Sequence, residues 1–181
     1  NLGWRRAAGR WVLFVDDDIL APPGLLAAHL EVLAADPRHG TIGPAVTAPE
    51  IADAPHFHYL DTRGVAKLKP GEAPARYFVT QNAAVARDAL AAVGGFDEGF
   101  SAYGFEDMDL GFRLEDAGVR FRVVPAPVPV HIHHHTLQEY LQKKRICCRH
   151  SLRAIAVRHP RRLREMRLDL VIDAVGASKP P

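Results

Sequence analysis

Three adjacent carboxylates, Asp16, Asp17 and Asp18, follow an apolar run at residues 11–15 that reads WVLFV. The run is short, continuous and rich in β-branched and aromatic residues, which is typical of a strand covered on both faces in a parallel sheet. Ligands of such sheets bind beyond the carboxyl ends of the strands. If the chain stays extended, Asp16 and Asp18 point to one side and Asp17 points to the other.

Carboxylates that converge at the rim of a sheet raise each other's pKa unless a cation neutralises them. Oxygen ligands of this kind suit Mg²⁺ or Mn²⁺, which usually share their coordination shell with the phosphates of a substrate. The alternative is that Asp18 caps the helix introduced by Pro22, Pro23 and Gly24. A cap accounts for only one of the three carboxylates, so we favour a metal site that includes Asp16 and Asp18.

A second acidic cluster lies in the sequence GFEDMDLGFRL at residues 104–114. On a helix, Asp107 shares a face with apolar residues and lies in the first turn, where the helix dipole favours a negative charge. An inward-facing carboxylate at a helix start is a candidate general base. Glu106 opens the helix and is suited equally to stabilising its first turn and to contacting a substrate. Asp109 precedes Arg113 by four residues, the spacing of a surface ion pair.

Four histidines follow a segment rich in Val and Pro, in the sequence VHIHHHT at residues 130–136. His131 and His133 point to the same side if the strand continues. An imidazole completes a mixed carboxylate and nitrogen site better for Mn²⁺ than for Mg²⁺. The alternatives are a surface run without function and a structural zinc site, but Cys147 and Cys148 do not offer the spacing that zinc requires. We therefore expect one histidine to be a metal ligand.

The composition allows one domain with a sizeable core, since the chain has 181 residues and 48% of them are hydrophobic. A net charge of +2 identifies no partner. No apolar run approaches the roughly 18 residues that span a bilayer. Because a bridge between adjacent cysteines is strained, Cys147 and Cys148 favour a reducing, cytoplasmic setting.

Basic residues are concentrated between Lys143 and Arg167, where Glu165 is the only acidic residue. The concentration predicts either a solvated helix face or peripheral contact with the anionic inner face of a membrane. Nucleic-acid binding is not expected, because aromatic residues do not alternate with the basic ones beyond Tyr140.

The chain alternates between strand and helix patterns, which predicts an α/β fold with a mostly parallel sheet flanked by helices. His29 lies on the apolar face of the first long helix, so we interpret it as a core histidine with satisfied hydrogen bonds. The tail VGASKPP at residues 175–181 is expected to be disordered. The expected strands are residues 11–15, 41–46, 57–60, 76–85 and 119–124, and the expected helices are residues 25–36, 87–93, 106–118 and 136–159.

Three motifs resemble inverting family 2 glycosyltransferases, which have the GT-A fold. NLGWRRAAGRWVLFVDDDI is similar to the family's N-x-G-x-x-x-A-x-G stretch and D-x-D strand end. QNAAVARDALAAVGGFDEGFSAYGFEDMDLGFRLEDAG is similar to the acceptor-side segment, with its GGFDE and ED-x-D motifs, and HIHHHTLQEYL is similar to the histidine strand and following helix. The resemblance implies a GT-A portion at residues 1–135, followed by a basic helix and tail at residues 136–181.

On the donor side, the resemblance places Asp16 near the ribose and diphosphate of a sugar nucleotide, with Asp17 assisting beside it. Asp18 would hold the divalent metal, and His131, or else His133, would lie near the metal and diphosphate. In the family, strands with the nucleobase pocket precede this stretch. We therefore expect the chain to be part of a longer enzyme and to bind sugar nucleotide weakly alone.

On the acceptor side, the resemblance makes Asp107 the base that takes a proton from the acceptor hydroxyl. Glu106 would bind the acceptor or share that role, and Asn82 and the Gly94-Gly95 turn would border the acceptor pocket. The implied activity is metal-assisted, inverting hexosyl transfer from a nucleoside-diphosphate sugar to a saccharide or lipid-linked acceptor, as in polysaccharide biosynthesis. The alternatives are a metal-dependent phosphohydrolase and a non-catalytic carbohydrate-binding or scaffold domain.

Overall fold

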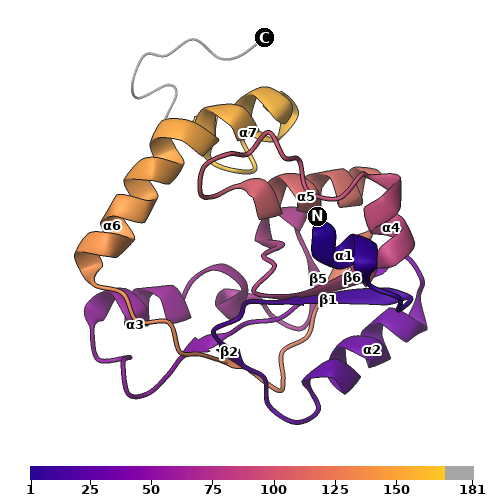
Figure 1. Cartoon of the computed structure of the whole chain (residues 1–181), viewed down its shortest axis with the longest axis horizontal. Coiled ribbons are helices and arrows are strands. Elements are labelled where there is room, and N and C mark those ends of the chain that lie inside the picture. Colours follow the sequence, from indigo (N-terminus) through magenta and orange to yellow (C-terminus); the bar gives the residue numbers. More distant parts are fainter. Residues whose placement is uncertain (170–181) are drawn as a thin grey trace.

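The computed structural model describes residues 1–169, so the tail at 175–181 lies outside the described residues. Two sheets form the centre of the described chain (Figure 1). The larger sheet has the spatial order β1 (Trp11–Val15), β6 (Asn82–Ala86), β3 (His39–Ile42), β7 (Arg120–Val123) and β5 (Gly71–Ala73). The smaller has the order β2 (Ile19–Leu20), β8 (Val130–His131) and β4 (Val46–Thr47).

The expected α/β class is confirmed, but the mostly parallel pairing of the sheet is wrong. In the larger sheet, only β3 and β7 run parallel, whereas β1–β6, β3–β6 and β5–β7 are antiparallel. Among the described strands β1 has β6 as its one neighbour, and Val12 is the only residue of β1 that is buried. The apolar run of β1 therefore reflects partial cover on both faces and does not reveal the direction of pairing.

Helices cover both faces of the larger sheet (Figure 1). The main core lies between the sheet and three helices, which contribute Leu90 from α4, Leu110 and Leu114 from α5, and Ile155 from α7. The helices are α1 (Leu2–Arg6), α2 (Leu25–Ala35), α3 (Pro55–Asp61), α4 (Arg87–Ala92), α5 (Glu106–Asp116), α6 (Leu137–Ile146) and α7 (Leu152–Arg158). Shorter 3₁₀ turns occur at Gly64–Lys67, Ala75–Tyr77 and Pro160–Arg162.

His29 of α2 is a buried core residue, as expected. Its Nδ1 lies 2.8 Å from Thr41 Oγ1, and its Nε2 lies 2.9 Å from Asn82 Oδ1. Burial lowers the pKa of His29, so the neutral ring joins α2 to β3 and β6.

Several expected boundaries are corrected by the structure. Residues 57–60 belong to helix α3, which starts at Pro55, a residue suited to the first helical turn. Residues 41–46 divide between β3 and β4, and residues 76–85 divide between a 3₁₀ turn and β6. The expected helix at 136–159 is α6 and α7 joined by one π-helical segment, Cys147–Ser151.

Helix α6 begins with a complete capping box, in which Thr136 and Glu139 bond reciprocally. None of its residues is buried, and its contacts with the rest of the chain include Tyr140 against the rings of His56 and His135. Within residues 1–169, no helix combines the length and apolar character needed to cross a bilayer.

Candidate active site and metal centre

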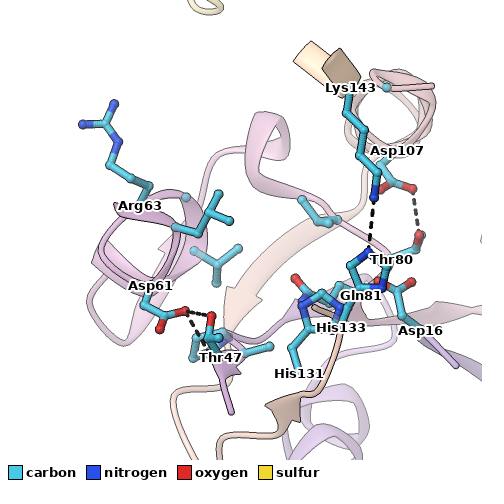
Figure 2. A pocket seen from close by; sticks show the side chains of 18 of the residues that line it. Asp16, Thr47, Asp61, Arg63, Thr80, Gln81, Asp107, His131, His133 and Lys143 are labelled. Carbon is cyan, nitrogen blue, oxygen red and sulfur yellow. Dashed lines mark hydrogen bonds between the residues drawn. The ribbon is translucent and has the colours of Figure 1, made fainter. Parts of the chain in front are cut away.

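A cavity of about 630 Å³ lies between the carboxyl end of β1, the start of α5, the histidine segment and α6. This volume falls in the range of small-molecule sites. Figure 2 shows Asp16, Asp107, His131 and His133 converging on it from different parts of the sequence. Glu106 also lines it.

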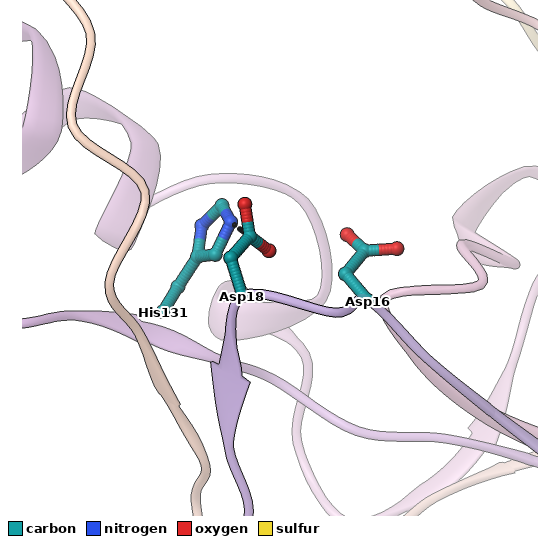
Figure 3. A group of neighbouring side chains, drawn as sticks. All are labelled: Asp16, Asp18 and His131. Atoms are coloured by element: carbon teal, nitrogen blue, oxygen red, sulfur yellow. Dashed lines mark hydrogen bonds and ion pairs between the residues drawn. The ribbon is translucent and has the colours of Figure 1, made fainter.

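Asp16, Asp18 and His131 form a cluster in which one ligand atom of each residue lies within 4.8 Å of the others (Figure 3). His131 Nε2 is 3.0 Å from Asp18 Oδ1, and His133 Nδ1 is 3.1 Å from Asp18 Oδ2. Two carboxylates and an imidazole at this spacing fit a divalent cation. Asp17 is exposed and lies outside both the cluster and the cavity lining.

A turn, and not strand alternation, brings the two carboxylates together. Strand β1 ends at Val15, and the amide of Ile19 donates to the carbonyl of Asp16. Ile19 then pairs with His131 in the β2–β8 ladder, and the amide of Ile132 donates to the carbonyl of Asp18. The capping alternative for Asp18 is excluded, because the N-cap of α2 is Gly24.

The environment of Asp16 favours a bound cation. Partial burial raises the pKa of this carboxyl, and the neighbouring carboxylate of Asp18 raises it further. Bringing these acids together is therefore unfavourable without positive charge between them.

Asp107, in the first turn of α5, faces the same cavity. Burial raises the pKa of Asp107 to about 6, and the charge of Glu106 contributes to the rise. Thr80 Oγ1 donates a 2.8 Å hydrogen bond to Asp107 Oδ1, which acts in the opposite direction. Glu106 Oε2 is buried and has no hydrogen-bond partner among the described residues. A carboxylate that titrates near neutral pH is suited to accepting a proton.

Asp109 has a different environment from Asp107. The expected ion pair with Arg113 is present, but it is buried and not on the surface, because only 1% of Asp109 is exposed. Asp109 also lies 2.8 Å from His159 Nε2. Burial alone would raise the pKa of Asp109, but the hydrogen bonds from His159 and Arg113 leave it below its ordinary value.

The structure does not bring Asn82, Gly94 or Gly95 to the cavity lining. The side chain of Asn82 is 2% exposed, and it joins His29 to the carbonyl of Pro44. Gly94 and Gly95 end α4 with positive φ angles, and a Cβ on Gly95 would overlap Trp4.

Three residues of the site were missed from the sequence. Thr80 and Lys143 are of common types, and only the fold brings them to the cavity. His135 continues the two-residue alternation of His131 and His133, a signal that was present in the sequence.

A model of glycosyl transferase family group 2 matches residues 11–156. The chain belongs to this family. The pre-mycofactocin glycosyltransferase of Mycobacterium tuberculosis is 30% identical over 166 residues, which cover 88% of the chain and 34% of that protein. The N-acetylglucosaminyl-diphospho-decaprenol L-rhamnosyltransferase of the same species is 29% identical over 67% of the chain and 46% of that protein.

The chain thus spans between a third and a half of the length of these two family relatives. A solved structure of GalNAc-T7 with UDP, GalNAc and Mn²⁺ superposes with a TM-score of 0.56 over 74% of this chain and 29% of that chain. At 14% identity this likeness concerns the fold alone, and that fold is GT-A.

Proposed function

We propose that this chain contains the catalytic centre of a glycosyltransferase that moves a hexose from a nucleoside-diphosphate sugar to an acceptor hydroxyl with inversion. The observation that carries the proposal is that Asp16 and His131, two members of the metal-type cluster, line the same cavity as a separate carboxylate, Asp107, whose pKa is about 6. Membership of family group 2 supports sugar transfer and gives no support to the phosphohydrolase or scaffold alternatives.

Asp107 would accept the proton of the acceptor hydroxyl as that oxygen attacks the sugar. A positioned base contributes roughly 10²- to 10⁴-fold to such a step. Thr80 orients the carboxylate, and Glu106 beside it is available to bind acceptor hydroxyls.

Asp16, Asp18 and His131 would hold a divalent ion, with His133 bonded to the second oxygen of Asp18. Such an ion neutralises charge on a leaving diphosphate, which is worth several kcal/mol. We propose Mn²⁺, because an imidazole in the ligand set favours it over Mg²⁺.

A saccharide or lipid-linked acceptor is the second part of the proposal. The name of the rhamnosyltransferase relative specifies a decaprenol-linked substrate, which supports the lipid-linked case. The exposed apolar and basic residues of α6 support peripheral contact with the inner face of a membrane, and hence a cytoplasmic location.

Replacing Asp107 by Asn tests the proposal. Asp107→Asn should lower the rate of sugar transfer at least 10²-fold, because an amide does not accept the proton, while affinity for the nucleotide product stays within a few-fold. Transfer is measured with radiolabelled donors, and affinity is measured by calorimetry with Mn²⁺.

Asp88→Asn is the matched control, because Asp88 also occupies the first turn of a helix but is exposed and lies outside the cavity lining. It should transfer sugar like the wild type. Equal activity of the Asp107→Asn variant, or release of free phosphate without any acceptor, would contradict the proposed function.

A further inference from the structure

The histidine segment forms one wall of the cavity beyond the metal cluster. His131, His133 and His135 alternate along it and line the cavity, whereas Ile132 and His134 are exposed. The ring centres of His131 and His133 are 5.8 Å apart, and those of His133 and His135 are 5.5 Å apart. The wall therefore continues from the cluster toward α3 and α6.

Lys143 of α6 lies over this wall. Its Nζ is 3.4 Å from Nε2 of His133, and the ammonium points into the cavity (Figure 2). No carboxylate of residues 1–169 lies within ion-pair distance of it. The half-buried ammonium of Lys143 thus faces the imidazole of His133, which carries no negative charge to balance it.

His135 adds an independent observation. Neither of its ring nitrogens has a hydrogen-bond partner within the described part of the chain, although both are shielded from solvent. The ring packs against Phe57, with the ring centres 4.8 Å apart. Buried polar atoms without partners are uncommon and unfavourable, and a ligand in the cavity would satisfy one of them.

We propose that Lys143, His133 and His135 form a phosphoryl-binding wall, which holds a phosphate group of a pyrophosphate-type ligand next to the metal cluster. The proposal rests on the proposed glycosyl transfer and extends it to residues outside the metal cluster.

Charge balance supports this assignment. A divalent ion balances the carboxylates of Asp16 and Asp18, so a diphosphate would bring negative charge that the cluster leaves unbalanced. Lys143 supplies the compact positive charge that suits phosphate oxygens, His133 holds its ammonium in place, and the unpaired ring N–H of His135 adds a directional hydrogen bond.

The geometry places this charge within reach of the cluster. The imidazole ring of His133 lies between the cluster and the ammonium of Lys143, since its Nδ1 is 3.1 Å from Asp18 Oδ2 and its Nε2 is 3.4 Å from Lys143 Nζ. A ligand with two linked phosphates can then contact the ion with one and the wall with the other. The phosphate belongs either to the leaving group of the donor or to a diphosphate-linked acceptor.

Binding of inorganic pyrophosphate to the full chain, measured by calorimetry with and without Mn²⁺, tests the wall. Lys143→Met keeps the side-chain length and removes the charge, so it should weaken binding about 10-fold. Lys143→Arg should stay within about 3-fold of the wild type, and His135→Phe, which keeps the packing against Phe57, should weaken binding by a few-fold. Lys69→Met is the matched control, because Lys69 is exposed and outside the cavity lining.

The two sources of the phosphate give different results. If Lys143→Met loses affinity for pyrophosphate only in samples with Mn²⁺, the wall binds the ion-bound diphosphate of the donor. If the variant loses affinity equally without Mn²⁺, the wall binds the acceptor phosphate. Either result supports the wall. If Lys143→Met binds pyrophosphate like the wild type while the wild type transfers sugar, the wall is overturned and the proposed function stands. A wild type that binds neither pyrophosphate nor sugar nucleotide overturns both.

Discussion

Asp107 experiences three opposing influences at the scale of the single residue. Burial and the charge of Glu106 raise its pKa, and the hydrogen bond from Thr80 lowers it, with a balance at about 6. Since the ordinary value is 3.8, keeping this group ionised at neutral pH costs roughly 3 kcal/mol of folding stability. The carboxylate is more basic than an exposed aspartate for the same reason, which is what proton abstraction requires.

The hydrogen bond from Thr80 predicts a change in pH dependence. Thr80→Val preserves the shape of the side chain and removes the donor, so the pKa of Asp107 should rise above about 6. A base works only when ionised, so activity is lost as the pH falls through this pKa. The acidic limb of the kcat profile should therefore move to higher pH, and Glu106→Gln should move it to lower pH.

Profiles of kcat from pH 5 to pH 9 would measure both shifts. Thr47→Val is a matched control, because Thr47 also lines the cavity but donates to Asp61. Its acidic limb should stay in place. Coincident limbs for Thr80→Val and the wild type would show that Asp107 is not the titrating base.

At the scale of the element, α5 places two acids of one motif in opposite environments. Asp107 faces the cavity, whereas Asp109 is buried against Arg113 and His159. Arg113 also donates to the carbonyls of Val93 and Gly95, so one buried network joins α5 to the end of α4 and to the residue after α7. The network fixes the helix whose first turn carries the candidate base.

Breaking this network should destabilise the protein strongly. Asp109→Asn removes the negative charge that faces Arg113, whose side chain is 26% exposed, so the cost should approach but not exceed the roughly 3 to 5 kcal/mol typical of a fully buried pair. Because hydrogen bonds hold the pKa of Asp109 below its ordinary value, the stabilisation is present at neutral pH and is lost only as the pH falls through that lowered pKa.

Urea unfolding at pH 7 measures the loss. Glu72→Gln is the comparison, because the side chain of Glu72 is 72% exposed in its pair with Arg122 and should contribute under about 1 kcal/mol. Similar unfolding midpoints for the two variants would mean that the buried network does not fix α5.

The sequence predicted some elements well because their signals are local. Helix α5 was identified from its apolar spacing and the glycine that ends it. Residue types that suit metals predicted a site with Asp16, Asp18 and one histidine, and the family resemblance favoured His131 over His133, which agrees with the cluster in the structure. Strand direction depends on neighbours far along the chain, so the antiparallel β1–β6 pairing was not accessible. Lys143 was not identified as a site residue, because its place over His133 arises only from the fold.

At the scale of the whole molecule, acidic and basic residues occupy different regions. Acidic groups converge in the cavity, while basic residues gather on α6 and the segment after it, although the net charge is only +2. Helix α6 belongs to both regions. Its basic residues Lys143 and Lys144 line the cavity, and none of the residues of this helix is buried, so the helix also contributes to the surface. A membrane in contact with the outer side of α6 would therefore lie close to the cavity, where the proposed lipid-linked acceptor would enter.

This arrangement predicts binding to anionic vesicles through α6. Leu137 and Leu141 lie one helical turn apart and are 52% and 45% exposed, and Arg145 follows Leu141 by one further turn. Each basic residue near an anionic surface is worth about 1 kcal/mol, and salt screens that attraction. The chain should float with phosphatidylglycerol-containing vesicles, less so in 0.5 M salt (about a 4 Å screening length), and not with neutral phosphatidylcholine vesicles.

Replacing both leucines by serine should weaken flotation about 10-fold, because their insertion provides the apolar part of the binding free energy. The matched control replaces Leu20 and Leu26, each 57% exposed but distant in sequence from the basic segment, by serine. If the control weakens flotation as much as the α6 variant, or if neutral vesicles bind equally well, α6 is not the membrane-contacting element. If only the α6 variant is impaired, it should also raise KM for a lipid-linked acceptor while leaving KM for the sugar nucleotide unchanged, because the proposed donor site lies inside the cavity.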